Sequence, residues 1–208
     1  MAQGKIDLLL LFNQVSKSVR QNKDSLNKAD TYNHDHGDHM VEIFDVITQA
    51  VKEKKNTEPA DQLEYAAALL RQKSHSGSGT LYAKNLEQAS KNILGKELNT
   101  GTVMTILQTL MGTAGKLSQS GGGDMLGSLL GQLSGGGSGA SSEGLDFGDL
   151  LGAGLDFMSE NQNGKSGLEA LTGALLSGSQ MAESPHRSQS GEIVTNALLG
   201  ALTSMMKK

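Results

Sequence analysis

One short stretch of this 208-residue chain, residues 33–40, reads Asn-His-Asp-His-Gly-Asp-His-Met. Five of these eight side chains are imidazoles or carboxylates, and the stretch holds three of the five histidines in the chain. Such groups can ligate a divalent cation or contact a phosphate when they face one point. A polar loop that enters a helix uses the same residue types for its turn geometry alone. The density of ligating groups favours a phosphate or metal role.

A zinc hydrolase is one specific interpretation of this stretch. His34, His36, Asp38 and His39 reproduce the H-x-H-x-D-H spacing that supplies zinc ligands in metallo-β-lactamase-type hydrolases. In those enzymes the pattern follows a hydrophobic strand of an αββα sandwich. Here it follows KDSLNKADTY, which is typical of helix and turn, and an amphipathic helix comes next. The zinc hydrolase is therefore a minor alternative.

The flanking residues support another interpretation. The segment LNKADTYNHDHGDHM resembles the first motif of the dihydroxyacetone kinase nucleotide-binding (DhaL-type) domain, Leu-Asn/Asp followed by a turn and then Asp-x-Asp-(Thr/His)-Gly-x-Asn-Met. Without gaps, Asn27, Asn33 and Asp35 match the metal-binding positions, and His36 and Gly37 match the Thr/His-Gly pair. The resemblance implies that the first three residues hold Mg²⁺ ions that bridge to nucleotide phosphates.

Two further stretches follow in the order of the family's motifs. Residues 76–82 resemble its Gly-(Ala/Asn)-Ser-Gly-x-Leu-Tyr turn, and residues 184–191 resemble the loop before its last helix. A turn of small residues at a helix start lets backbone N–H groups approach a phosphate. Residues 124–126 lie where the family has a Gly-Asp-x-Thr-Met-Leu helix start. The nucleotide- or phosphate-binding residues that the resemblance implies are His36, Gly37, Ser76, Gly77, Ser78, Gly79, Thr80, Met125, Arg187 and Gly191.

The resemblance also implies a cofactor and a partner. ADP or ATP would bind with Mg²⁺, Mn²⁺ or another divalent ion, and the chain would be a phosphotransferase subunit that acts with a separate substrate-binding protein. Asn33 stands where the family has an acidic residue, which removes negative charge from a site for two dications. Asp30 and Asp38 are possible substitute ligands. A catalytically degenerate DhaL-like binding or scaffold module is the alternative, and no catalytic residue is assigned.

Helices are the elements expected to position these motifs. Asp38 is the expected N-cap of a helix that ends near residue 54, and Pro59 the expected first-turn residue of the next. No useful length alternates with period two, so no sheet is expected. Periodicity predicts an all-α fold of about eight helices, and the resemblance to the DhaL-type domain implies that they form an antiparallel barrel or bundle. Apolar residues recur at helical spacing in 38–54, 59–70, 82–93, 103–111, 124–133, 145–158, 167–178 and 191–206.

Composition bounds the class of protein. The chain has no cysteine, so it forms no disulfides, and its net charge of −4 disfavours nucleic acid as a partner. It contains no apolar run long enough for a membrane helix and no signal-peptide cleavage pattern, so we expect a cytoplasmic protein and no membrane partner. Seventeen of its 27 glycines lie between residues 121 and 178. We expect a single domain over 1–208, with a flexible Gly/Ser-rich loop at about 134–144 and homodimerisation possible.

Overall fold

The structure is a computed structural model that describes residues 6–112, 176, 179 and 184–206. Helices make up the fold of these residues, and no strand occurs among them, which confirms the all-α class. The expected helices at 124–133, 145–158 and 167–178, the expected loop at 134–144 and Met125 lie outside the described residues, apart from Leu176. The helices are α1 (Leu8–Gln21), α2 (Lys23–Ala29), α3 (His36–Glu53), α4 (Pro59–Lys73), α5 (Gly77–Ile93), α6 (Thr100–Met111) and α11 (Pro185–Met206).

Several helix ends follow the local rules that the sequence obeys. Pro59 occupies the first turn of α4, as predicted, where its missing N–H costs no helix hydrogen bond. The Asn99 side chain caps α6 by accepting from the backbone N–H of Thr102 at 2.8 Å. Gly112 ends the same helix in the left-handed conformation, with a φ of +78°, which glycine adopts without a steric penalty. Local sequence therefore decides where α4 begins and where α6 begins and ends.

The start of α3 differs from the prediction. The helix begins at His36, so Asp38 lies in its first turn and not at the N-cap. Asp35 occupies the N-cap position, but its side chain makes no capping hydrogen bond. The side chain of Asn27 in α2 supplies the cap instead. Because Asn27 belongs to another helix, the sequence around residue 36 does not reveal it.

The start of α11 also differs from the prediction. Residues 185–191 were expected to form a loop, but the helix begins at Pro185. Proline favours this first helical position because its ring fixes a helical φ. The N–H of Ser188 donates to the carbonyl of Ser184 at 2.9 Å and closes the first turn. Arg187 and Gly191 are therefore helical residues.

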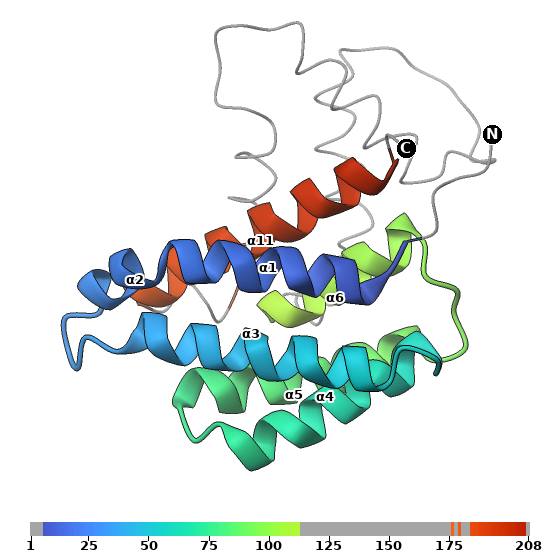
Figure 1. The fold of residues 1–208 in the computed structure, drawn as a ribbon, viewed down its shortest axis with the longest axis horizontal. Coiled ribbons are helices and arrows are strands. Elements are labelled where there is room, and N and C mark those ends of the chain that lie inside the picture. Colours follow the sequence, from blue (N-terminus) through green and yellow to red (C-terminus); the bar gives the residue numbers. More distant parts are fainter. Residues whose placement is uncertain (1–5, 113–175, 177–178, 180–183, 207–208) are drawn as a thin grey trace, which may run out of the picture.

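The helices pack lengthwise around one hydrophobic core (Figure 1). α1 lies against α3 and α11, α3 continues the contact to α4, and α4 and α5 form an antiparallel pair. Phe44 and Tyr82 meet edge to face, with ring centroids 5.2 Å apart, in a core that is otherwise mainly aliphatic. Alanines of α4 and α5, among them Ala66, Ala67 and Ala83, are fully buried. Small side chains let helix backbones approach closely, so few aromatic residues suffice to fill this core.

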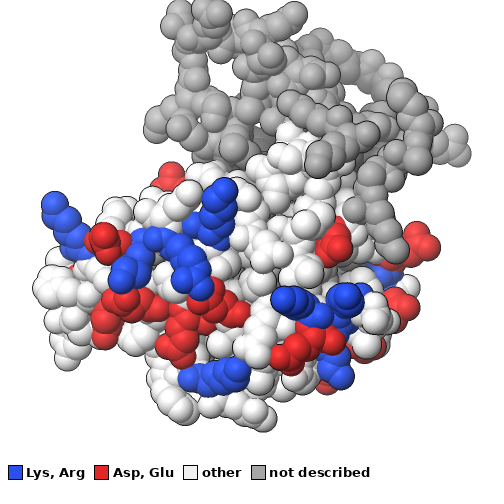
Figure 2. Space-filling view, viewed as in Figure 1, with Lys and Arg blue, Asp and Glu red and all other residues white. Residues whose placement is uncertain are grey.

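The described surface mixes charges of both signs (Figure 2). Ion pairs join Arg20 to Asp45, Lys23 to Asp38 and Arg71 to Glu87. Such exposed pairs stabilise a fold by less than about 1 kcal/mol each. The surface charges therefore contribute little to stability compared with the core. Within the described part of the chain, no helix is long and apolar enough to cross a membrane.

Candidate functional site

The helix starts of α3, α5 and α11 meet at one end of the molecule (Figure 1). His36, at the start of α3, places its Nε2 atom 3.0 Å from the Oγ of Ser190 in α11. A Cβ atom built on Gly77, at the start of α5, would lie 3.5 Å from the Nη2 of Arg187 in α11. The three stretches singled out in the sequence, 33–40, 76–82 and 184–191, thus lie together.

His36 is a buried, neutral link between α3 and α11. Only 4% of its surface is exposed. The Ser190 hydroxyl donates to the Arg187 carbonyl at 2.9 Å, so this hydroxyl is left to accept from Nε2–H of His36. Burial, with smaller contributions from the neighbouring His186 and Arg187, lowers the pKa of His36 to about 4 against the opposing effect of Asp30. His36 therefore carries no charge at neutral pH.

His186 and Asp30 complete the buried polar cluster. The ring centroid of His186 lies 4.7 Å from that of His36, and its Nδ1 lies 3.9 Å from the Oδ1 of Asp30. Burial acts to raise the pKa of Asp30, but the backbone N–H of Tyr32, the charge of His186 and further backbone N–H groups outweigh it, so the net pKa is lowered. Asp30 is thus an ionised carboxylate facing His186. Sequence reasoning missed His186 and Ser190, although both lie within the stretch 184–191.

Asn27, predicted as a metal ligand, instead caps α3. Its Oδ1 accepts from the N–H of Gly37 at 2.6 Å and of Asp38 at 3.2 Å, and its Nδ2 donates to the Asp38 carboxylate at 2.7 Å. Hydrogen bonds from Lys23 and Asn27 lower the pKa of Asp38. A carbonyl oxygen has two lone pairs, and both are in use here. Asn27 as arranged does not fit the predicted role of Mg²⁺ ligand.

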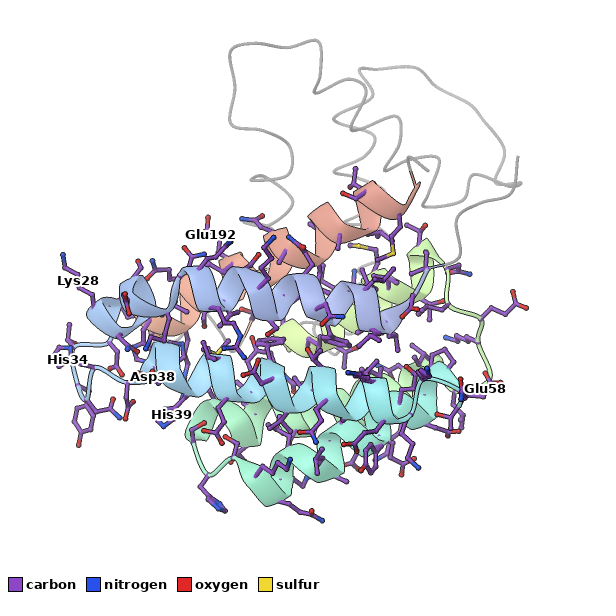
Figure 3. The ribbon with its side chains drawn as sticks, viewed as in Figure 1. Lys28, His34, Asp38, His39, Glu58 and Glu192 are labelled. Carbon is purple, nitrogen blue, oxygen red and sulfur yellow. The ribbon has the colours of Figure 1, made fainter. Side chains whose placement is uncertain are left out.

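The other two predicted metal ligands have different surroundings. Asn33 is exposed, and the Oδ1 of Asp35 lies 3.3 Å from the Nδ1 of His39 in the next turn. In the described part of the chain, no three His, Asp or Glu side chains are arranged to hold a metal ion. The histidines of the zinc-hydrolase pattern do not face one point: His34 lies in the exposed loop before α3 (Figure 3) with a φ of +59°, whereas His36 is buried against Ser190.

Gly37 allows α2 and α3 to touch. A Cβ atom at this position would lie 2.1 Å from the backbone oxygen of Lys23 and 2.7 Å from the Oδ1 of Asn27. No real side chain tolerates such an approach, so Gly37 is required for the contact. The His-Gly pair of the sequence motif therefore combines a buried link to α11 with a close contact to α2.

The small residues at the start of α5 form a tight cap. The Oγ of Ser76 accepts from the N–H of Gly79 at 2.9 Å, and a Cβ atom on Gly79 would lie 2.3 Å from the Oγ of Ser74. Ser78 is buried, and the hydroxyl of Thr80 donates to the carbonyl of Ser76 at 3.2 Å. Helix geometry leaves the N–H groups of Gly77 and Ser78 without an acceptor within α5, and the Cβ position of Gly77 lies 3.5 Å from the Nη2 of Arg187. Gly191 is buried within α11, one turn beyond that arginine.

No protein-family model, curated protein or solved structure matches the chain. The family resemblance therefore rests on the three motifs and on their order.

Proposed function

We propose that this chain is a DhaL-like helical domain that binds the phosphate groups of a nucleotide where α3, α5 and α11 meet. The observation that carries the proposal is the position of Arg187 against the start of α5. A guanidinium group donates two parallel hydrogen bonds to a phosphate, and the start of a helix adds backbone N–H donors. Together they form a phosphate-binding arrangement built from residues 110 positions apart.

The local charge balance supports an anionic ligand. Neither α5 nor α11 has an acidic residue in its first turn. The acidic residue in the first turn of α3, Asp38, is paired with Lys23 at 3.0 Å. Each helix start carries roughly half a positive charge, and the three starts meet here. Asp30 is the buried carboxylate of the cluster, and it faces His186.

The contribution of the metal in this proposal differs from the one implied by the family motif. Asn27 is committed to the α3 cap, and Asp35 is the only carboxylate among the three predicted ligands because residues 27 and 33 are both asparagine. A divalent ion, Mg²⁺ or Mn²⁺, would neutralise phosphate charge when it arrives with the nucleotide. The protein's own part is to bind the phosphates through Arg187 and the helix starts. We further propose a cytoplasmic phosphotransferase subunit whose substrate is held by a separate protein.

Isothermal titration calorimetry tests the proposal. ADP, ATP and inorganic phosphate would each be titrated into the full chain with Mg²⁺, with Mn²⁺ and with EDTA. We expect ADP or ATP to bind, and Arg187→Gln to weaken binding roughly tenfold or more, the usual loss for a charge-assisted hydrogen bond. Lys84→Gln removes an exposed positive charge elsewhere on α5 and is the matched control. Absence of binding by every ligand, or equal binding by Arg187→Gln, would refute the proposal.

The second candidate function is a catalytically degenerate DhaL-like scaffold. It is favoured by the neutral side chains at two of the three metal positions and by the capping role of Asn27. A phosphoryl-transfer assay with candidate substrate-binding subunits separates the two functions. Turnover that is lost in Asp35→Asn would reject the scaffold. Nucleotide binding without any turnover would support it.

A further inference from the structure

One histidine of the buried cluster faces a hydroxyl with one ring nitrogen and a carboxylate with the other. The Nε2 of His186 lies 3.2 Å from the Oγ of Ser184, and its Nδ1 lies 3.9 Å from the Oδ1 of Asp30. A hydroxyl, an imidazole and a carboxylate in this order form the arrangement that activates a serine as a nucleophile. Neither Ser184 nor Asp30 contributes a donor to the proposed phosphate site, so their position beside His186 is not accounted for by phosphate binding.

Asp30 decides which ring nitrogen of His186 carries the proton. Its carboxylate is ionised and buried, and it accepts from the backbone N–H of Tyr32 at 3.1 Å, which holds it in place. An ionised carboxylate only accepts, so its charge favours a proton on the Nδ1 of His186 that faces it. The Nε2 atom is then unprotonated and able to accept the proton of the Ser184 hydroxyl.

The His186 ring is supported by a neighbouring ring and by its own helix. The His36 ring lies against it, with the two centroids 4.7 Å apart and the planes tilted by 59°. His36 is in turn held by its contact of 3.0 Å with Ser190, one turn further along α11. The side chain of His186 is 24% exposed and Ser184 is half-buried, so a reagent in solution can reach both.

Arg187 favours a phosphoryl group as the electrophile that Ser184 attacks. The Ser184 carbonyl accepts from the N–H of Ser188 at 2.9 Å, so Ser184 is the residue that immediately precedes α11 and Arg187 lies in the turn that follows. At a helix start, the capping residue and the third helical residue lie close enough to exchange hydrogen bonds. A phosphate bound by Arg187 would therefore be held by the same helix turn that carries the Ser184 hydroxyl.

We propose that Ser184 accepts the terminal phosphoryl group of a nucleoside triphosphate, with His186 as the general base and Asp30 as the residue that positions His186. This inference rests on the proposed function, because the nucleotide is the one proposed to bind at Arg187. The Oγ of Ser184 forms a bond to the γ-phosphorus while the bond from that phosphorus to the β–γ bridging oxygen breaks. The electron pair of the broken bond leaves with the nucleoside diphosphate, and the hydroxyl proton passes to the Nε2 of His186. A phosphoserine results, and the negative charge of Asp30 stabilises the imidazolium.

A fluorophosphonate probe tests the activation of Ser184 without any nucleotide. The probe presents an electrophilic phosphorus and loses fluoride, so it labels serines that a neighbouring base activates. We expect mass spectrometry of the labelled full chain to locate the probe on Ser184, and Ser184→Ala to abolish the label. Ser188→Ala removes a hydroxyl one turn further along α11 and is the matched control, which should label as the wild type does. A chain that carries no probe on Ser184 would overturn the proposal.

ATP with a radioactive γ-phosphorus, supplied to the full chain with Mg²⁺, tests the donor. We expect radioactive phosphate on Ser184, and none when the radioactive atom is the α-phosphorus. Calorimetry with ADP measures binding separately from transfer. If ADP binds but Ser184 gains no phosphate, this inference is wrong while the proposed function stands; if neither ADP nor ATP binds, both are wrong. Radioactivity from the α-phosphorus would indicate nucleotidyl transfer and would also overturn the inference.

Two further variants separate proton transfer from structural support. His186→Ala should slow the labelling of Ser184 by about 100-fold or more, and added imidazole should restore part of the rate because a free base can enter the gap. Asp30→Asn keeps an acceptor for the N–H of Tyr32 but removes the charge opposite His186, so labelling should slow by about tenfold or more while ADP affinity stays unchanged. A rate in Asp30→Asn equal to that of the wild type, or one that falls only in step with ADP affinity, would refute the positioning role. Failure of imidazole to restore any rate to His186→Ala, with its helical circular dichroism retained, would refute the role of His186 as base.

Discussion

The Nε2 of His36 and the Oγ of Ser190 lie 3.0 Å apart, although 154 positions separate them in the chain. The same hydroxyl donates to the carbonyl of Arg187, so one buried chain of hydrogen bonds runs from α3 into the first turn of α11. This chain fixes the start of α11 against α3. It thereby sets where the Arg187 side chain meets α5, which is the feature on which the proposed phosphate site depends.

The first prediction concerns this hydrogen bond. His36→Ala leaves a cavity and removes the hydrogen bond that the buried Ser190 hydroxyl accepts, so it should destabilise the fold by about 2–4 kcal/mol. His36→Gln retains an N–H donor and should cost less. Urea denaturation followed by circular dichroism at pH 7.5 measures both values. Equal stability of the alanine variant and the wild type would show that the α3–α11 link contributes nothing.

The second prediction concerns pH. The pKa of His36 is about 4 in the folded protein and near 6.5 without burial, so the folded state binds fewer protons between these values. Stability should be fully present above pH 6.5, fall as the pH drops toward 4, and lose at most about 3 kcal/mol from this group. His36→Gln does not titrate and should flatten the curve over this window. A curve of the same slope in that variant would assign the dependence to other groups.

The third prediction compares two glycines in helices. Gly37→Ala would force a methyl group against the backbone oxygen of Lys23 and should destabilise the fold by about 2–3 kcal/mol. Gly200→Ala has open space and should stabilise α11 by up to about 1 kcal/mol, because alanine is the better helix former. Thermal unfolding of both variants measures the contrast. Equal effects of the two changes would contradict the close α2–α3 contact.

The fourth prediction separates a capping role from a metal-binding role for Asn27. Asn27→Asp would place a second carboxylate at the present 2.7 Å contact with Asp38 and should destabilise the start of α3 by about 1–2 kcal/mol. The same change would strengthen Mg²⁺ binding if residue 27 were a ligand. Thermal unfolding with and without about 10 mM Mg²⁺ distinguishes the capping role from the metal-binding role, because a bound ion stabilises the folded state. Stabilisation of the variant by Mg²⁺ would restore the metal-ligand role.

The fifth prediction uses Ser76, which caps α5. Ser76→Asp retains an acceptor for the N–H of Gly79, so stability should change by less than about 0.5 kcal/mol. The added negative charge beside Arg187 should nevertheless weaken phosphate binding severalfold. Ser76→Ala removes the cap, so it should lower the stability by about 1 kcal/mol. It adds no charge, so it should weaken phosphate binding less than Ser76→Asp does. Calorimetry and denaturation on the same preparations check both halves. Unimpaired nucleotide binding by Ser76→Asp would place the ligand away from α5.

Helical periodicity was sufficient to predict the all-α class, and Pro59 was sufficient to predict the start of α4. Pro59 begins α4 as predicted because proline suits only the first turn of a helix. The starts of α3 and α11 were mispredicted for different reasons. The α3 cap is supplied by Asn27, ten residues away from Gly37 and in another helix. The start of α11 was mispredicted because the family resemblance implied a loop at 184–191. The ordinary preference of proline for the first turn of a helix would have placed the start at Pro185, where the structure has it.

By itself, the sequence determined which residue types are present, their helical spacing and the three stretches that could contact a phosphate. Only the tertiary structure decided which neighbours each of those side chains has. Asn27 and Gly37 serve the α2–α3 contact, and His36 serves the link to α11, whereas Arg187 lies against the start of α5. The physical reason is that an amide, an imidazole or a glycine suits a helix cap, a buried link or a close contact as well as it suits a ligand. Only the partners that packing supplies distinguish these roles.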